Sequence, residues 1–133
     1  MRKIQTLVLI IILTFAMLIS SCSSASSLRV GWACFNGSQK MDCSYRVFSG
    51  REVSQERFEA GESVIVNYDL SLESGSLIFT IENPAGEVIF TASPVDSIED
   101  SHTFTAEQDG RYSFVVEGEE AEGAFLIEWQ RSS

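Results

Sequence analysis

Apolar and polar residues alternate over much of the second half of the chain. From residue 62 onward Val64, Val66, Tyr68, Leu70 and Leu72 occupy one set of alternating positions, and the residues between them are mainly polar. A period of two residues is typical of a β-strand with one face buried, because successive side chains point to opposite faces. We therefore predict a strand here, with its apolar face on the core.

The same alternation returns after each of several turn signals. Turns are predicted at residues 73–76, 83–86 and 108–110, and a loop at 118–123, because these segments are rich in Gly, Pro, Ser, Asn and Asp. In 83–86, Pro84 presets φ for the second turn position and Gly86 tolerates a positive φ. The apolar faces between these turns contain Leu77, Phe79, Ile81, Val88, Phe90, Phe104, Ala106, Tyr112, Phe114, Val116, Phe125, Ile127 and Trp129.

The first half of the mature chain adds further strands, over residues 28–35, 43–48 and 52–58. No window in the second half shows apolar residues at helical spacing. Many short strands with a turn every 8–12 residues are typical of a sandwich or barrel. The expected fold is an all-β, antiparallel, jelly-roll-like β-sandwich of about seven to nine short strands, preceded by a helical signal peptide.

The N-terminus has the order of a secretory leader. Arg2 and Lys3 precede an apolar run of 13 residues, 7–19, whereas a permanent transmembrane helix needs about 20 apolar residues. The run ends in Ile19-Ser20-Ser21-Cys22, which resembles the lipobox of bacterial lipoproteins. This resemblance implies that a peptidase cuts before Cys22 after the thiol has been acylated. Ordinary secretion, with cleavage near residue 25, stays open.

Three regions follow: a signal peptide at 1–21, a lipidated cysteine and serine-rich tether at 22–27, and the β-sandwich at 28–133. Several acyl chains anchor a protein stably, and the short tether holds the domain near the bilayer. We expect an exported protein on a membrane surface. That surface is the outer membrane if the cell has two membranes, because Ser23 and Ser24 follow the cysteine, and otherwise the outer face of the cell membrane.

Lipidation of Cys22 leaves Cys34 and Cys43 as a pair. Disulfides persist in exported proteins, and Asn36-Gly37-Ser38 supplies turn residues that place the two cysteines on facing positions of a hairpin. We predict a disulfide between them. Two free thiols are the alternative, because one histidine and this spacing match no zinc pattern.

Net charge excludes one class of partner. The chain has 9 Lys+Arg and 19 Asp+Glu. Arg2 and Lys3 lie in the leader, so the mature part carries 9 − 2 = 7 basic and 19 acidic side chains, a net charge of −12. A nucleic-acid backbone needs basic side chains, so no nucleic acid is expected as a partner. Anionic lipid headgroups are repelled too, which leaves the N-terminal lipid as the attachment to the membrane.

Four segments carry a family resemblance. Phe58-Glu59-Ala60-Gly61-Glu62-Ser63-Val64, Ile81-Glu82-Asn83-Pro84-Ala85-Gly86, Phe104-Thr105-Ala106 and Gly110-Arg111-Tyr112-Ser113-Phe114 resemble β-sandwich domains of the GOLD type. Bacterial prepeptidase C-terminal domains share a similar closing pattern. The resemblance covers residues 52–130 and implies an accessory domain that binds proteins or packs beside another domain.

Several residues are candidates for chemistry. The histidine His102 follows Ser101, but adjacent strand residues face opposite ways, so the two cannot act as base and nucleophile there. Acidic segments 96–100 and 117–122 hold the oxygen ligands that Ca²⁺ prefers, without the spacing of a known loop. Trp32, Phe35 and Tyr45 flank the predicted disulfide and form a possible aromatic ligand platform, although Trp32 and Trp129 also suit the core.

The sequence thus favours a non-catalytic domain without metal or cofactor. The preferred function is protein interaction or structural support in the cell envelope, with another envelope protein as the partner. The alternative is a carbohydrate- or cell-wall-binding lipoprotein, and a hydrolase comes third. Strand addition at an unprotected edge is a further route to a partner, but the pattern does not show which strands are edges.

Overall fold

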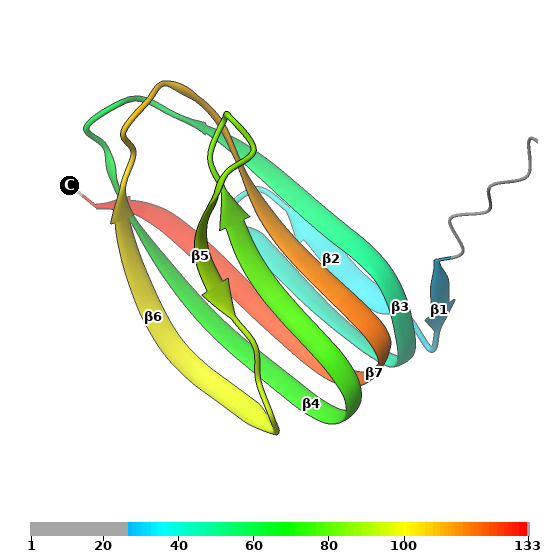
Figure 1. Ribbon diagram of the computed structural model, residues 1–133. Coiled ribbons are helices and arrows are strands. Elements are labelled where there is room, and N and C mark those ends of the chain that lie inside the picture. The colour runs from blue at the N-terminus through cyan, green and yellow to red at the C-terminus, as the bar shows by residue number, and fades with distance from the viewer. Residues whose placement is uncertain (1–26, 133) are drawn as a thin grey trace, which may run out of the picture.

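The structure is a computed structural model that describes residues 27–132. The signal peptide, the lipobox and residues 23–26 of the tether lie outside the described residues. Seven strands follow one another along the chain (Figure 1): β1 (Leu28–Val30), β2 (Ala33–Gly37), β3 (Lys40–Phe58), β4 (Ser63–Glu82), β5 (Val88–Ala92), β6 (Ser97–Thr105) and β7 (Gly110–Ser132). The described residues contain no helix, so no helix there is long and apolar enough to cross a membrane.

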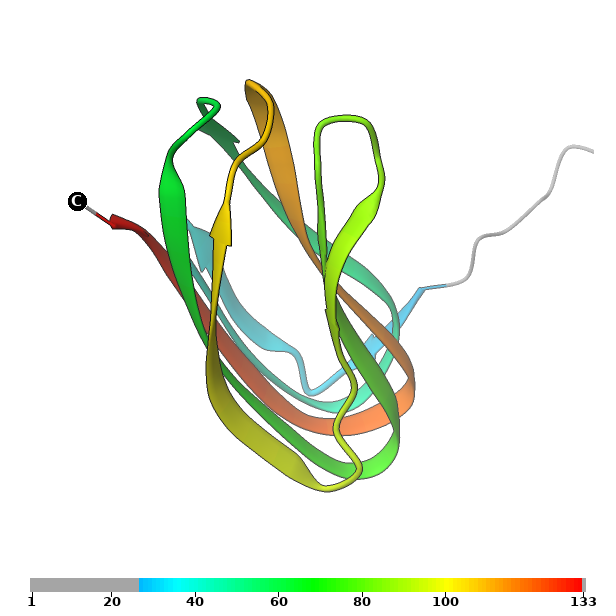
Figure 2. The same ribbon diagram turned by 60° about the vertical axis from the view of Figure 1, so that its left-hand side comes forward.

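Three of the seven strands are much longer than expected. β3, β4 and β7 span 19, 20 and 23 residues, and each bends so that its two halves lie in different layers (Figure 2). We expected strands to end at a turn at 73–76 and at a loop at 118–123, and this prediction is wrong. Both segments are bends within continuous strands, where the β4–β7 register shifts. A Cβ at Gly75, which has a φ of 77°, would overlap the Glu120 carbonyl.

The bends create two facing layers, and every strand pairing is antiparallel. We call them sheet A and sheet B. Sheet A contains, in spatial order, β2, the first half of β3, the second half of β7, the first half of β4, and β6. Sheet B contains β1, the second half of β3, the first half of β7, the second half of β4, and β5. The predicted antiparallel β-sandwich of about seven to nine strands is confirmed: the described residues form seven strands, of which three are longer than expected.

The core lies between the sheets and is made by the alternating apolar positions. The five alternating apolar residues predicted for the core in the first half of β4, Val64, Val66, Tyr68, Leu70 and Leu72, are all buried. Trp129 is only 3% exposed, and its ring stacks on Phe114 with centroids 4.0 Å apart. The Tyr112 hydroxyl donates to the Gln108 carbonyl at 2.9 Å. This bond fixes the turn before β7 while the tyrosine ring fills the core.

The hairpin of β2 and β3 confirms the predicted disulfide. Cys34 stands directly opposite Cys43 in the register, with Cα atoms 4.0 Å apart, and the two sulfurs are bonded. The turn lies one residue later than the Asn36-Gly37-Ser38 signal: Ser38 and Gln39 connect the paired residues Gly37 and Lys40. Gln39 takes the positive φ of this turn, 64°.

Candidate binding groove

Strand register builds a polar surface on the outer face of sheet A. Asp69 in β4 is paired with Glu99 in β6 and with Leu126 in β7. Residues two apart on a strand share a face, so the neighbouring row projects from the same side. That row consists of Asn67, Ser101 and Glu128.

The two rows line a depression of about 550 Å³. We call it the acidic groove, and define it by its lining residues Asn67, Tyr68, Asp69, Glu99, Asp100, Ser101, Leu126 and Glu128. A smaller depression of about 270 Å³ shares Asn67 and Glu128 with it and continues to the turn between β2 and β3. The concave surface therefore extends across sheet A from β6 to the hairpin that carries the disulfide.

The groove has a strong negative charge. Three exposed carboxylates, those of Asp69, Glu99 and Glu128, project from this outer face, and none of the lining residues is basic. The fourth acidic lining residue, Asp100, alternates with Glu99 and directs its side chain to the other face of β6. Lys40 stands at one end, where its Nζ lies 3.7 Å from Glu128 Oε1 and 4.0 Å from Asp42 Oδ2. Like charges that face each other across neighbouring strands, as in Asp69 and Glu99, repel. A cation bound between them would lower this repulsion.

One groove residue reaches into the core. Tyr68 is 7% exposed and stands opposite Asp100 in the register. Burial first, and then the Asp100 charge, raise the pKa of the Tyr68 hydroxyl above its usual value. The tyrosine ring also packs on Phe79 and Phe90. Tyr68 therefore lines the groove while its ring is part of the core.

The predicted aromatic platform is not assembled. Tyr45 is only 5% exposed and packs between Trp32 and Phe125, with ring centroids 5.7 and 6.0 Å away. Trp32 is half-buried against the core and covered by the Arg29 guanidinium, 4.4 Å from its ring. Phe35 is 59% exposed and points to the outer face of sheet A, because it alternates with the inward Cys34. The three rings therefore form no common surface.

His102 lies in β6, opposite Val66, on the inner side of the sheet. Its ring stacks on Phe90 with centroids 4.0 Å apart. Ser101, the next residue, lines the outer acidic groove. The expectation that Ser101 and His102 point to opposite faces is confirmed, so this pair does not form a nucleophile and base.

The two acidic segments proposed for Ca²⁺ are distributed along strands. Residues 97–100 belong to β6, and 117–122 form the bend of β7. Alternation in β6 sends Glu99 and Asp100 to opposite faces. Within residues 27–132, no three His, Cys, Asp or Glu side chains come together in a way that could hold a metal ion.

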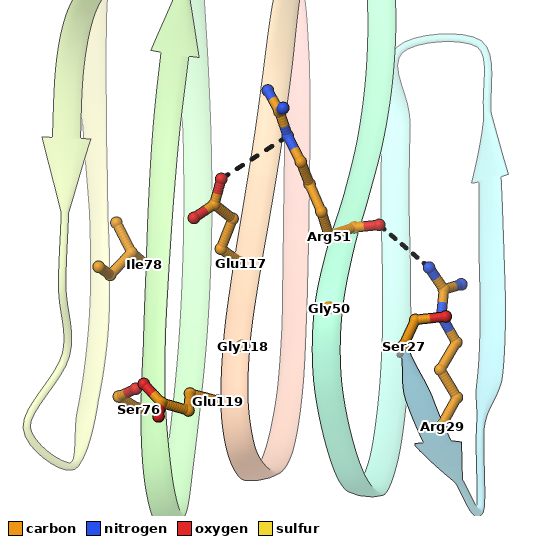
Figure 3. Close-up of a pocket in the computed structure, with 9 residues that line it drawn as sticks. All are labelled: Ser27, Arg29, Gly50, Arg51, Ser76, Ile78, Glu117, Gly118 and Glu119. Atoms are coloured by element: carbon orange, nitrogen blue, oxygen red, sulfur yellow. Dashed lines mark hydrogen bonds and ion pairs between the residues drawn. The ribbon is translucent and has the colours of Figure 1, made fainter. Parts of the chain in front are cut away.

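A second depression, of about 670 Å³, lies on sheet B near Ser27 (Figure 3). Arg29 and Arg51 contribute its positive charge, but both guanidinium groups already have partners. Arg29 Nη1 lies 2.7 Å from a Glu52 carboxylate oxygen, and Arg51 Nε lies 3.7 Å from Glu117. Because these charges are paired within the fold, this surface is a weaker candidate than the acidic groove.

The sequence pattern missed most of the groove. Asn67 and Asp69 were expected on the polar face of their strand, but Glu99 and Glu128 join them only through pairings across 30 to 61 residues of sequence. The polar half of each alternating pattern was the available signal. It names candidates on each strand without giving the register that brings them together.

Comparisons with known proteins give no family. No family model matches the chain, and no curated protein matches it. Among solved structures, a carbohydrate-binding module described as CBM4 has 8% identity and a TM-score of 0.48, over 77% of this chain and 79% of the other. The module CBM6cm-2 from Cellvibrio mixtus lichenase 5A, in complex with cellotriose, has 13% identity and a TM-score of 0.47, over 82% and 92%.

A periplasmic inhibitor of g-type lysozyme from Aeromonas hydrophila is also similar, with 14% identity and a TM-score of 0.43, over 84% of this chain and 93% of the inhibitor. Each of these proteins is similar to this chain only at low sequence identity and with a TM-score below 0.5. The comparisons therefore assign neither a family nor a ligand.

Proposed function

We propose that this chain is a non-catalytic binding domain of a bacterial cell envelope, tethered by a lipid on Cys22, whose acidic groove binds a basic segment of another envelope protein. The observation that carries this proposal is the groove. Three carboxylates, those of Asp69, Glu99 and Glu128, project from one face of the acidic groove, and none of the residues that line the groove is basic. Charge complementarity of this kind selects partners and speeds their association.

The export signals support the location. The basic residues, short apolar run and Ile19-Ser20-Ser21-Cys22 of the leader resemble those of lipoproteins. The Cys34–Cys43 disulfide suits an oxidising compartment outside the cytoplasm. From Cys22 to the first described residue, Ser27, the chain spans at most about 18 Å. The partner is therefore expected within about one domain diameter of the membrane.

The anchor has its own test. Wild-type protein should incorporate labelled palmitate and fractionate with membranes, and Cys22→Ala should do neither. If the variant still fractionates with membranes and wild type takes up no palmitate, the lipid anchor is wrong. Mass spectrometry of the mature N-terminus would then identify the cleavage site used instead.

The binding function is tested in the native cell. Crosslinking of the full chain, followed by identification of the captured protein, should recover one envelope protein with a basic segment. A triple variant, Asp69→Asn, Glu99→Gln and Glu128→Gln, should reduce capture at least tenfold. Its matched control, Glu59→Gln, Glu73→Gln and Glu107→Gln, changes net charge equally at exposed positions outside the groove and should retain capture. Equal loss in both variants would contradict a groove-specific site.

A second candidate function rests on Phe35. Its exposed ring lies in the same transverse row as Asp42, Leu126 and Asp69, and an aromatic ring beside carboxylates can stack on a sugar and bond its hydroxyl groups. This hypothesis predicts glycan binding on an array that Phe35→Ala abolishes. If no glycan binds while crosslinking captures a protein, the carbohydrate function is excluded.

A further inference from the structure

Within the part of the chain that the structure describes, no other strand covers the outer backbone edge of β6. This strand pairs with β4 on one side and is the outermost strand of sheet A. At one end of this ladder the Leu72 N–H donates to the Asp96 carbonyl, and at the other the Ala106 N–H donates to the Glu62 carbonyl. The even-numbered residues of β6 therefore bond to β4. The N–H and C=O groups of the odd-numbered residues face away from the sheet.

A different edge, residues 51–58 of β3, is closed by side chains. The carbonyls of Arg51, Val53 and Arg57 accept hydrogen bonds of 3.0, 3.0 and 2.7 Å from Arg29, Asn36 and Arg131. In β6, no side chain of the described residues bonds to an outward carbonyl. Only the Ser101 N–H is taken, by the Asp100 carboxylate at 2.8 Å. The β6 edge thus keeps most of its hydrogen-bonding capacity.

We propose that the basic partner segment adds to β6 as an extra strand. This inference rests on the proposed function and specifies how the acidic groove is occupied. An added strand would lie about 4.8 Å from β6. Its outward side chains would stand beside Glu99 and Ser101, and long basic side chains there reach Glu99 directly. A second copy of this chain fits poorly, because pairing β6 with itself brings the acidic side chains of Glu99 and Asp100 close to their copies.

The inner side of the added strand meets a different surface. Ile98 and His102 are half-buried on the inner side of β6, and Phe90 stacks on His102. Side chains that alternate with the basic residues would lie against this border, which is apolar at Ile98 and Phe90 and carries the Asp100 side chain between Ile98 and His102. The partner segment is therefore expected to alternate basic and apolar residues over at least five positions. This alternating pattern restricts the possible partner segments more than a requirement for positive charge alone.

Hydrogen exchange gives a direct test, with the full chain in mild detergent. The probe is a synthetic peptide with alternating Lys and Val, and its control is a peptide of the same composition with the lysines grouped. On addition of the alternating peptide, the amides of Glu99, Thr103 and Thr105 should exchange at least tenfold more slowly. Even-numbered amides of β6, already bonded to β4, should change little.

A substitution tests the same contact. Thr103→Pro removes one outward N–H and leaves the ladder to β4 intact, since proline is tolerated where the N–H of an edge strand faces solvent. It should weaken binding of the alternating peptide at least tenfold, whereas Thr103→Ala should bind like wild type. If Thr103→Pro does not fold, the exchange rates of the wild-type amides decide.

The outcomes separate the two proposals. If the peptide binds, the groove triple variant abolishes binding, and the outward amides are not protected, strand addition is wrong and the basic-segment function stands. If neither peptide nor any basic envelope protein binds the groove, the proposed function fails as well. Protection that rises with protein concentration without peptide would indicate pairing between copies and would overturn the assignment to a basic partner.

Discussion

Polar groups on the two long sides of the sandwich differ in whether they have hydrogen-bond partners within the fold. On the β2 side, between β2 and residues 51–58 of β3, carboxylates turn inward between the sheets and are held by partners. Glu52 bonds Arg29 at 2.7 Å and Asn36 at 2.8 Å. Glu56 accepts hydrogen bonds from Arg131, at 3.1 Å, and from the Trp129 ring nitrogen. Polar side chains thus cap the backbone of residues 51–58 of β3 on this side.

On the β6 side, between β6 and β5, the inner positions are mostly apolar or aromatic. Ile98 and Phe104 pack against the core, and His102 stacks on Phe90. The outward backbone of β6 carries one side-chain cap, from Asp100, among the described residues. The comparison shows that the side chains near each edge strand decide whether its outward backbone groups are already hydrogen-bonded. The polar caps protect one edge from strand pairing, and the other edge is left for a partner.

Loss of the Cys34–Cys43 disulfide should give the largest effect on the β2 side. For a loop of about ten residues, the chain-entropy estimate is about 2.7 kcal/mol. Reduction, or the double change Cys34→Ser and Cys43→Ser, should lower the free energy of unfolding in urea by this amount. As the control, addition of reductant should not change the free energy of unfolding of the double variant. An equal urea midpoint for oxidised and reduced wild type would show that β2 needs no covalent clamp.

Arg131→Met should give the next largest effect and lower the free energy of unfolding by about 1.5 kcal/mol, because the arginine makes several bonds but is 44% exposed to solvent. The arginine bonds Glu56 and Glu62, caps the Arg57 carbonyl and lies 5.0 Å from the Phe58 ring centre. Without Arg131, the Glu56 carboxylate, which is 20% exposed, loses its ion pair and keeps the hydrogen bond from the Trp129 ring nitrogen. Urea unfolding measures the effect.

The control for that change is Arg111→Met. Arg111 is exposed and stands opposite another arginine, Arg57, so its removal should be neutral or slightly stabilising. Arg131→Lys keeps the charge but loses the fork geometry, and should fall between wild type and Arg131→Met. Equal effects for the two Met variants would show that the contacts of Arg131 contribute nothing.

Asn36→Ala and Asp100→Ala compare the caps on the two sides directly. Asn36 donates to Glu52 and to the Val53 carbonyl, so its loss should cost about 1 kcal/mol. Asp100→Ala should change stability by less than about 0.5 kcal/mol, while the Ser101 amide exchanges faster and the alternating peptide binds more tightly. Asn67→Ala, an exposed amide in the groove, is the control for Asn36. Unchanged Ser101 exchange would contradict the cap.

The sequence pattern predicted the core well because alternation is local. Residues 64–72, and the apolar positions of β7, needed only the period of two to be placed inside. The same pattern gave no facing for Glu52 and Glu56, which lie on an inner face. Their partners Asn36 and Arg131 lie 16 and 75 residues away in sequence. Inward carboxylates depend on such distant pairings, which the residues of one strand do not reveal.

The bends and the groove were hidden for related reasons. Gly75 and Gly123 indicate places where the chain departs from regular strand geometry, and both a turn and a bend need such residues. Only the pairing of both halves of β4 with both halves of β7 shows that these strands continue. The groove likewise depends on register. From its own strand, Asp69 is predicted only to be a solvated residue, and the pairing of β4 with β6 shows that Glu99 lies beside it.

The smallest expected effect comes from Tyr45→Phe, at the one buried side-chain polar atom of the described residues that has no hydrogen-bond partner. Because nothing is lost with this hydroxyl, the change should be neutral or slightly stabilising at neutral pH. Tyr112→Phe, which removes the bond to Gln108, should cost about 1 kcal/mol and is the matched control. A destabilisation by Tyr45→Phe equal to that of the control would show that the Tyr45 hydroxyl does have a partner.

The stabilities of wild type and Tyr45→Phe should also respond differently to alkaline pH. Burial raises the pKa of Tyr45 from 10.0 to about 12, so the folded protein holds this proton where the unfolded chain releases it. The resulting contribution to stability is complete below pH 10 and is lost as the pH rises from 10 to about 12. Wild type should therefore lose more stability than Tyr45→Phe over this interval. Tyrosinate absorbance should also show one fewer late-ionising group in the variant, and identical titrations would mean that Tyr45 ionises like an exposed tyrosine.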